Sequence, residues 1–273
     1  MIPIVSKLHQ KYYEEKLHAK QRFNERYFEK HKSEYDIAQF KDKYLGQECF
    51  VVCNGPSLKA EDLDKIAEKG IVSFAANRVF NIYPKTKWRP EYISVADEGY
   101  VYEKDIIDGI EQSQPEMFFV RSQAAYTLRK LKCNVCPIFT DGATSLLENP
   151  MFSDDLSKVI YAIGTVTYFN IQIAAYMGFK KIYIIGADHK YSNTRNKDGS
   201  ITKNDGIESY FAEIGENGEK KKITIPQASP TWQIDIAYES ALNYCINNGI
   251  EIYNATRGGF LEIFKRISFD EIV

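Results

Sequence analysis

A short polar loop, Asn54-Gly55-Pro56-Ser57, directly follows the apolar run Cys49–Cys53. Gly55 lets the backbone approach a ligand closely, and Pro56 suits the first turn of a helix. Ser57 adds a hydroxyl beside the free N–H groups of the helix that we expect to begin there. Because helix N-termini favour phosphate, the loop predicts the phosphate side of a nucleotide site. It matches neither a P-loop nor G-x-G-x-x-G, which argues against Walker-type ATP hydrolysis and ordinary NAD binding.

A second helix start has a similar composition. Thr165 and Thr167 place two hydroxyls at the beginning of an apolar helix that we expect over residues 165–177, and Gly178 ends it. Gly164 supplies a flexible residue just before them. The free N–H groups of this helix start predict a second contact to an anion.

Polar residues also follow four later apolar runs. They are Asn77-Arg78, Asp97-Glu98, Asp188-His189 and Asn254-Ala255-Thr256-Arg257. In an open parallel sheet, ligands bind beyond the carboxyl ends of the strands. One such group can be no more than the polar turn that ends a strand. Together with the loop at Asn54 they indicate a site that includes Asn77, Arg78 and Asp97.

One histidine stands apart from the others as a candidate for proton transfer. His189 lies beside Asp188 at the end of a predicted strand, whereas the other three histidines lie within the first 31 residues. Histidine is the side chain best matched to proton transfer near neutral pH. A purely structural histidine is an equal alternative. Tyr191 is close enough in sequence to assist or to bind phosphate.

Arg257 is followed by Gly258 and Gly259, and its role is open in two ways. The guanidinium can hold an anionic group of a donor or an acceptor, or it can belong to a turn at the surface. Cys133 and Cys136 form the only close cysteine pair, and a zinc site would need further cysteines or histidines nearby. We therefore predict no metal site.

The elements that position these residues alternate between apolar strands and helices. The predicted strands are Cys49–Cys53, Ile71–Ala76, Tyr92–Ala96, Met117–Val120, Lys181–Ala187 and Glu251–Asn254, and the predicted helices follow Ser57 and cover 165–177 and 233–247. Near-continuous apolar strands between helices are typical of a parallel sheet that is covered on both faces. We expect a Rossmann-like α/β fold with a mostly parallel sheet.

Three segments are expected from the change in texture along the chain. Residues 1–45 predict a helical arm, with one long helix or a helical pair over 7–44, and residues 46–273 form the nucleotide-binding catalytic domain. The polar stretch 192–222 predicts a lid or mobile surface loop. Because basic residues in this arm are interleaved with acids, its sequence favours packing on the main domain or homo-oligomerisation over peripheral membrane attachment.

Composition excludes several classes of partner and location. The chain has 273 residues and a net charge of −2, which calls for no nucleic-acid partner. Its five cysteines indicate reduced thiols rather than a disulfide framework. No apolar run reaches the roughly 18 residues of a membrane span, and the start is not typical of a signal peptide. The expected location is the cytoplasm, with the inner face of the membrane as an alternative.

Three blocks of sequence resemble a known family. They are Cys49–Leu58 (CFVVCNGPSL), Gly164–Tyr191 (GTVTYFNIQIAAYMGFKKIYIIGADHKY) and Asn254–Arg266 (NATRGGFLEIFKR). Together they resemble the bacterial family described as 6-hydroxymethylpterin pyrophosphokinase MptE-like, which occurs in surface-polysaccharide and flagellin-glycosylation contexts. The first two blocks are also similar to the lipooligosaccharide sialyltransferases of glycosyltransferase family 42. The segment 1–45 lies outside the resemblance.

The sialyltransferase resemblance implies a GT-A-like variant of the fold and a CMP-activated donor sugar. It implies these roles for matching positions: Asn54, Gly55 and Ser57 at the phosphate and ribose, Asn77 at the nucleotide or donor sugar, Asp97 in place of an Asn, Thr165 and Thr167 around a T-S-G segment, Asp188 near the cytidine ribose, and Tyr191 one residue away from a phosphate-binding Tyr. These are expectations from likeness, not from spacing.

One departure from the sialyltransferases concerns the catalytic base. Those enzymes carry a base histidine after the lid, but Ile225–Asp235 has none here. The resemblance therefore leaves three alternatives: His189 is the base, an acid such as Asp97, Asp205 or Glu208 is the base, or the reaction differs from that of the sialyltransferases.

The expected function is an inverting, metal-independent glycosyltransferase that moves a sugar, sialic-acid-like by resemblance, from a nucleotide donor to a cell-surface glycan acceptor. No cofactor is obligatory. One alternative is a pyrophosphokinase-like transferase that uses ATP and Mg²⁺ held by carboxylates such as Asp97 and Asp188. A third interpretation is a non-catalytic nucleotide-binding scaffold in glycan assembly.

Overall fold

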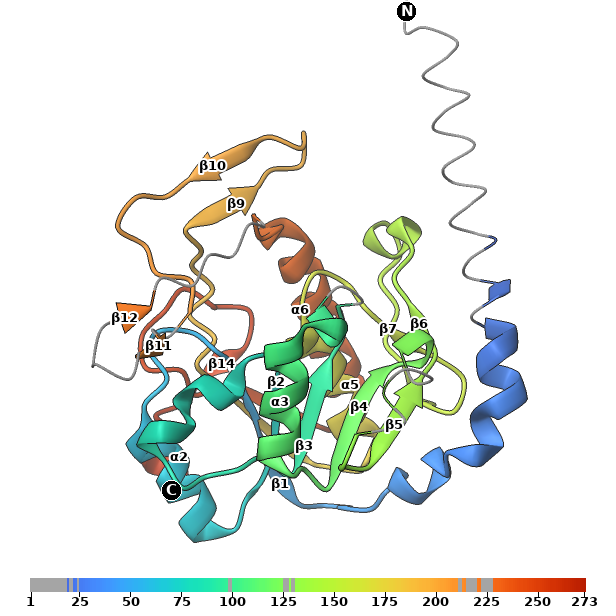
Figure 1. The fold of residues 1–273 in the computed structure, drawn as a ribbon. Coiled ribbons are helices and arrows are strands. Elements are labelled where there is room, and N and C mark those ends of the chain that lie inside the picture. The colour runs from blue at the N-terminus through green and yellow to red at the C-terminus, as the bar shows by residue number, and fades with distance from the viewer. Residues whose placement is uncertain are drawn as a thin grey trace, which may run out of the picture.

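The computed structural model describes residues 19, 22–23, 25–97, 100–124, 128, 131–210, 213–214, 220–221 and 228–273. Its centre is an eight-stranded sheet in the order β14-β13-β8-β1-β2-β3-β4-β5 (Figure 1). Every neighbouring pair in this sheet runs parallel. The strands are β1 Glu48–Val52, β2 Val72–Ala76, β3 Tyr92–Val95, β4 Met117–Arg121, β5 Val135–Ile138, β8 Lys181–Ile185, β13 Glu251–Asn254 and β14 Lys265–Arg266. The predicted Rossmann-like α/β fold is confirmed.

The strand order reverses beside β1, which pairs with β2 on one side and with β8 on the other. Chain order therefore proceeds outward from β1 to β5 in one direction and from β8 to β14 in the other. A reversal of this kind opens a crevice at the carboxyl ends of the two central strands, where doubly wound sheets bind ligands. The loop after β1 and the loop after β8 lie at this crevice.

Helices cover both faces of the sheet, as the alternation of elements predicts. They are α2 Ala60–Lys69, α3 Lys104–Ser113, α5 Val166–Tyr176 and α6 Thr231–Asn247. Helices α5 and α6 share a core with one face, and α2 and α3 pack on the other (Figure 1). Nearly every residue of α5 is buried, because this helix lies between the sheet and α6. Such a position explains why its sequence is apolar all round.

Three elements of the main sheet and its cover were not predicted: β5, β14 and α3. Strand β5 contains Pro137, a residue that is uncommon inside strands. Its position at the edge of the sheet allows a proline, because one side of an edge strand needs no ladder hydrogen bonds. Burial raises the pKa of the Cys136 thiol to about 12, so this cysteine acts as a small core residue.

The predicted helix over 7–44 is wrong in its last third. Helix in the described part of this segment ends at His31, and 3₁₀ turns follow at η1 Lys32–Glu34 and η2 Ile37–Phe40. The core that α5 shares with the sheet contains three buried side chains of this segment, Phe28, Ile37 and Phe40. A single straight helix could not turn all three toward the sheet at this spacing. The chain bends so that they reach it.

The predicted lid contains a hairpin in its described part. Strands β9 Asn193–Arg195 and β10 Ile201–Lys203 pair antiparallel, and the hairpin extends beyond the sheet near the start of α6 (Figure 1). The backbone of Ser229 joins it through hydrogen bonds to Asn193 and Arg195. The segment just before α6 is therefore tied to the base of the hairpin.

The remaining elements are short. They are η3 Val79–Lys85, η4 Tyr100–Tyr102, η5 Ser122–Ala124, β6 Thr140–Asp141, η6 Thr144–Leu147, β7 Ile160–Tyr161, β11 Glu213–Ile214, β12 Lys220–Lys221 and η7 Phe269–Glu271. Among the helices in the described ranges, none combines the length and apolar character needed to cross a bilayer.

Candidate functional site

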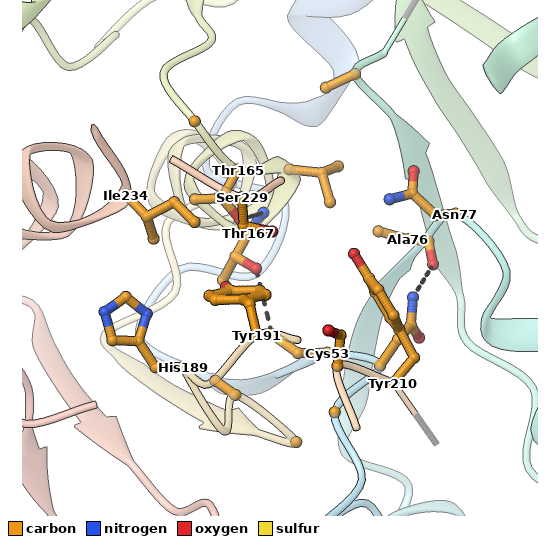
Figure 2. Close-up of a pocket in the computed structure, with 18 of the residues that line it drawn as sticks. Cys53, Ala76, Asn77, Thr165, Thr167, His189, Tyr191, Tyr210, Ser229 and Ile234 are labelled. Carbon is orange, nitrogen blue, oxygen red and sulfur yellow. Dashed lines mark hydrogen bonds between the residues drawn. The ribbon is translucent and has the colours of Figure 1, made fainter. Parts of the chain in front are cut away.

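A cavity of about 390 Å³ opens at the carboxyl ends of the central strands. This volume is in the range of small-molecule sites. The predicted site residues that line it are Asn54, Gly55, Asn77, Asp97, Thr165, Thr167, Asp188, His189 and Tyr191. Figure 2 shows His189 and Asn77 on opposite sides, with Thr165 and Thr167 between them. The remaining predicted residues, Pro56, Ser57, Arg78 and Arg257, are not part of its lining.

The loop after β1 holds a carboxylate in place, which differs from the expected phosphate cradle. Helix α2 begins at Ala60 rather than at Ser57, and Pro56 lies in a turn before it. The Ser57 backbone N–H and hydroxyl both donate to Asp188 Oδ2, at 3.2 and 2.7 Å. Ser57 therefore orients Asp188, and its donors are not directed at a ligand.

Gly55 is required where the loops after β1 and β8 meet. A Cβ at Gly55 would lie 2.0 Å from Asp188 Oδ2 and 2.4 Å from the carbonyl oxygen of Gly186. The Gly55 N–H donates to that same carbonyl at 2.8 Å. Only a residue without a side chain allows the two strand ends to come this close. Glycine was predicted at this position so that the backbone could approach a ligand. In the structure it instead allows the close approach of Asp188 and Gly186.

The start of α5 faces the cavity, as predicted. Thr165 is the N-cap, and its hydroxyl accepts the Thr167 N–H at 3.2 Å. The Thr167 hydroxyl lies 3.2 Å from Cys53 Sγ. The first N–H groups of a helix have no intrahelical acceptor, and Gly164 through Thr167 all line the cavity. This helix start can bind an anion such as phosphate.

His189 is held by an acid that sequence analysis missed. Its Nε2 lies 2.8 Å from Asp235 Oδ1, on the first turns of α6. A carboxylate accepts hydrogen bonds, so Nε2 of the neutral ring carries the proton and Nδ1 keeps its lone pair. Nδ1 is buried and has no hydrogen-bond partner among the described residues. His189 also has a φ of 54°, a left-handed conformation that is uncommon outside glycine.

Tyrosine rings stand next to His189. Tyr191 lies edge-on to the imidazole at 6.0 Å between ring centroids, and Tyr238 from α6 lies 6.1 Å away. Burial raises the pKa of both phenols well above 10. Both therefore stay protonated and can donate a hydrogen bond to a ligand. Tyr210, from the lid segment, also projects into this space (Figure 2).

Two cationic side chains that sequence analysis missed also line the cavity. They are Arg121, at the end of β4, and Lys190, directly after His189. Arg78, which was predicted to bind the nucleotide, instead forms ion pairs with Glu103 and Asp105 outside the cavity. For Arg121, its position at a strand end is the one sequence signal that could have suggested a place in the cavity.

Arg257, whose role the sequence left open, is part of a network of ion pairs. Its guanidinium donates to both oxygens of Asp62, at 2.7 and 2.9 Å, and also to Asp270. These contacts join the loop after β13 to α2 and to the C-terminal segment. They raise the pKa of Arg257 and lower that of Asp270. The guanidinium therefore contacts carboxylates of the protein in this structure, and its contact with a substrate anion stays a prediction.

We expect Arg257→Met to lower the free energy of unfolding by about 2 kcal/mol, because it leaves the buried Asp62 carboxylate without its cation. The affinity of the folded protein for nucleotide should not change. Urea unfolding measures the first effect and calorimetric titration the second. Lys104→Met, which removes an exposed ion pair with Asp108, is the matched control and should change stability little. A large loss of nucleotide affinity in folded Arg257→Met would return this arginine to the site.

Side chains suited to metal binding do not gather in groups of three or more in the part of the chain that the structure describes. Asp188 and Asp97 both line the cavity. One oxygen of Asp188 is already engaged by Ser57.

Comparison with known proteins identifies both a family and a similar fold. Residues 25–194, more than half of the chain, match the family described as 6-hydroxymethylpterin diphosphokinase MptE-like. The match includes residues 25–45, which the three sequence blocks left outside. Among solved structures, the chain is similar to the MAf glycosyltransferase from Magnetospirillum magneticum AMB-1, with 16% identity and a TM-score of 0.52. A search of curated proteins found no match.

The likeness to the glycosyltransferase structure covers 84% of this chain but only 35% of the other. The chain therefore spans about a third of the length of that protein. At this level of identity the likeness shows the fold alone. The similarity to the sialyltransferases of glycosyltransferase family 42 stays a prediction from the sequence blocks.

Proposed function

The chain belongs to the 6-hydroxymethylpterin diphosphokinase MptE-like family, and from this premise and the polar groups of its cavity we propose that it is a glycosyltransferase that uses a sugar nucleotide. The observation that carries the proposal is the His189–Asp235 pair, at 2.8 Å, on the wall of a cavity that also contains the start of α5. The His189–Asp235 pair would provide a base, and the start of α5 would provide a site for an anion. A solved protein of similar fold is described as a glycosyltransferase, which supports this choice.

In the proposed reaction, His189 Nδ1 takes the proton of an acceptor hydroxyl. The acceptor oxygen forms a bond to the anomeric carbon of the donor sugar, on the face opposite the leaving group. The bond from that carbon to the phosphate oxygen breaks, and its electron pair leaves with the nucleotide. The configuration is therefore inverted. Asp235 holds the ring in the correct tautomer and stabilises the imidazolium that forms.

The leaving phosphate needs donors and positive charge. The N–H groups at the start of α5 supply the first, and Arg121 and Lys190 supply the second from the lining of the cavity. Tyr191 can add a hydrogen bond from its protonated phenol. Charge stabilisation by these groups supports a transfer without an obligatory metal. The hairpin β9–β10 is joined to the residues before α6, and we propose that it closes over the donor.

For the donor we propose a CMP-activated, sialic-acid-like sugar, on the strength of the sequence blocks, and for the acceptor a cell-surface glycan. We place the reaction in the cytoplasm or at the inner face of the membrane. Self-association through the segment 1–45 is part of the same proposal. A second candidate, a diphosphokinase-type transfer from ATP, is favoured only by the description of the family.

Thermal unfolding with CMP, CDP, UDP, GDP and ATP, each with and without Mg²⁺, separates these candidates. We expect CMP at about 100 times its dissociation constant, without metal, to stabilise the native state by about 2.7 kcal/mol. Stabilisation by another nucleoside phosphate without metal would keep the glycosyltransferase and change the donor. Stabilisation only by ATP with Mg²⁺ would instead support the diphosphokinase and overturn the proposal.

A further inference from the structure

Three carboxamides meet at the end of β2, on the side of the cavity opposite His189. Asn54 Nδ2 donates to the carbonyl of Ala76 at 2.9 Å, and Asn170 Nδ2 donates to the carbonyl of Ala75 at 3.3 Å. Asn77 is the next residue of the same strand end and lies beside Ala76 in Figure 2. All three asparagines line the cavity.

The amide oxygens of these residues are buried and lack hydrogen-bond donors. Oδ1 of Asn54, of Asn77 and of Asn170 each has no partner among the described residues. The orientation of two of the amides is fixed, because a backbone carbonyl can only accept and so must face the NH₂ group. The oxygens of Asn54 and Asn170 are therefore the atoms left over. An acceptor buried without a donor costs about 1–3 kcal/mol.

Another amide on the same helix shows how unusual this arrangement is. Gln172 is fully buried, two residues after Asn170. Its oxygen accepts the N–H groups of Ser153 and Tyr161, and its NH₂ donates to Tyr161 and Tyr168. Asn170 has a relative exposure of only 1%, so solvent contact does not relieve its oxygen. The fold provides hydrogen-bond partners for both ends of the Gln172 amide, whereas the oxygen of Asn170 has none among the described residues.

We infer that Asn170, with Asn54 and Asn77, forms an acceptor-only subsite that binds an uncharged, hydroxyl-bearing part of the substrate. Three oxygens with partial negative charge repel a phosphate, which offers only acceptors. Sugar hydroxyls donate hydrogen bonds and match them. The inference rests on the proposed function, and it divides the cavity: phosphate at the start of α5, and hydroxyl groups at the end of β2. Asn54 then contacts ribose or sugar rather than phosphate.

The test compares Asn170→Leu with Gln172→Met in the full-length chain, first without ligand. Leucine has nearly the shape of asparagine, and it removes both the unpartnered oxygen and one long hydrogen bond, from Nδ2 to Ala75 at 3.3 Å. These two effects oppose each other, so Asn170→Leu should unfold close to the wild-type temperature. Gln172→Met removes four side-chain hydrogen bonds in a buried position and should unfold at least about 4 °C lower. If Asn170→Leu falls as far as Gln172→Met, the oxygen has a structural partner and the inference is overturned.

Titration calorimetry then identifies the hydroxyl groups. The probes are CMP, its 2′,3′-dideoxy analogue and CMP-N-acetylneuraminic acid. If the subsite takes ribose, Asn170→Leu should bind CMP about 10-fold more weakly or worse and no longer distinguish it from the dideoxy analogue. If it takes the donor sugar, only CMP-N-acetylneuraminic acid should lose affinity. Wild-type affinity of Asn170→Leu for every probe that binds the wild type would overturn the inference.

The two proposals fail in different ways. If no probe binds the wild-type chain, the CMP-linked form of the proposed function is overturned, and the unfolding temperatures of Asn170→Leu and Gln172→Met still decide whether the oxygen is a structural acceptor. If the probes bind the wild type but Asn170→Leu and Gln172→Met lose the same stability, the proposed function stands and the subsite is overturned.

Discussion

His189→Asn should lower the turnover number of sugar transfer by about 100-fold or more, because it removes the proposed base. Nucleotide affinity should stay within about 3-fold of the wild type, because the phosphate contacts at α5 are untouched. Asparagine is chosen because residue 189 has a φ of 54°, which asparagine adopts more readily than alanine does. Steady-state transfer at saturating substrate measures the first quantity, and calorimetric titration with nucleotide measures the second.

Asp235→Asn tests the same dyad from its other side. An amide can donate to Nε2, which moves the ring proton to Nδ1 and removes the lone pair that the reaction needs. The turnover number should therefore fall by a similar factor, and the double variant should be no worse than either single one, because the pair acts as a unit. His31→Asn, at a partly buried histidine paired with Glu34, is the control. Unchanged turnover in His189→Asn would remove this residue from the chemistry.

Local patterns were enough to predict most of the fold. Strands β1, β2, β3 and β8 are apolar runs that end in polar residues, and the observed bounds differ from the predicted ones by two residues at most. Helix α5 was visible because Gly164 and Thr165 mark its start and Gly178 its end. The pattern failed where an edge strand tolerates proline, at β5, and where three aromatic or aliphatic side chains of the segment 25–45 had to reach a core.

Partners that are distant in sequence could not be predicted. Ser57 was expected to contact phosphate, but its partner Asp188 lies 131 positions later. Arg257 pairs with Asp62 over 195 positions, and Asp235 with His189 over 46. In each case the residue type indicated polar chemistry at a strand or helix end, and the three-dimensional fold determined which charge it meets. The sequence patterns therefore indicated where the cavity lies, but the contacts that they predicted for Ser57 and Arg257 differ from the observed ones.

Gly55→Ala should abolish detectable nucleotide binding, because this glycine sets the distance between the two loops that form the cavity. The new Cβ would come within 2.0 Å of Asp188 Oδ2 and 2.4 Å of the Gly186 carbonyl oxygen. The carboxylate could rotate away, but the carbonyl is backbone and belongs to the end of β8. Relief therefore requires the ends of β1 and β8 to separate, with a cost of about 1–3 kcal/mol, as for other overpacking substitutions.

That separation would also break the hydrogen bond from the Gly55 N–H to Gly186 and move Asp188 away from Ser57. Gly142→Ala is the matched control, since it also lies beside the cavity and its Cβ would meet no atom closer than 3.5 Å. Calorimetric titration with nucleotide and thermal unfolding distinguish lost binding from lost folding. If folded Gly55→Ala binds nucleotide as Gly142→Ala does, the crevice between β1 and β8 is not where the nucleotide lies. The proposed site would then have to move away from the switch point of the sheet.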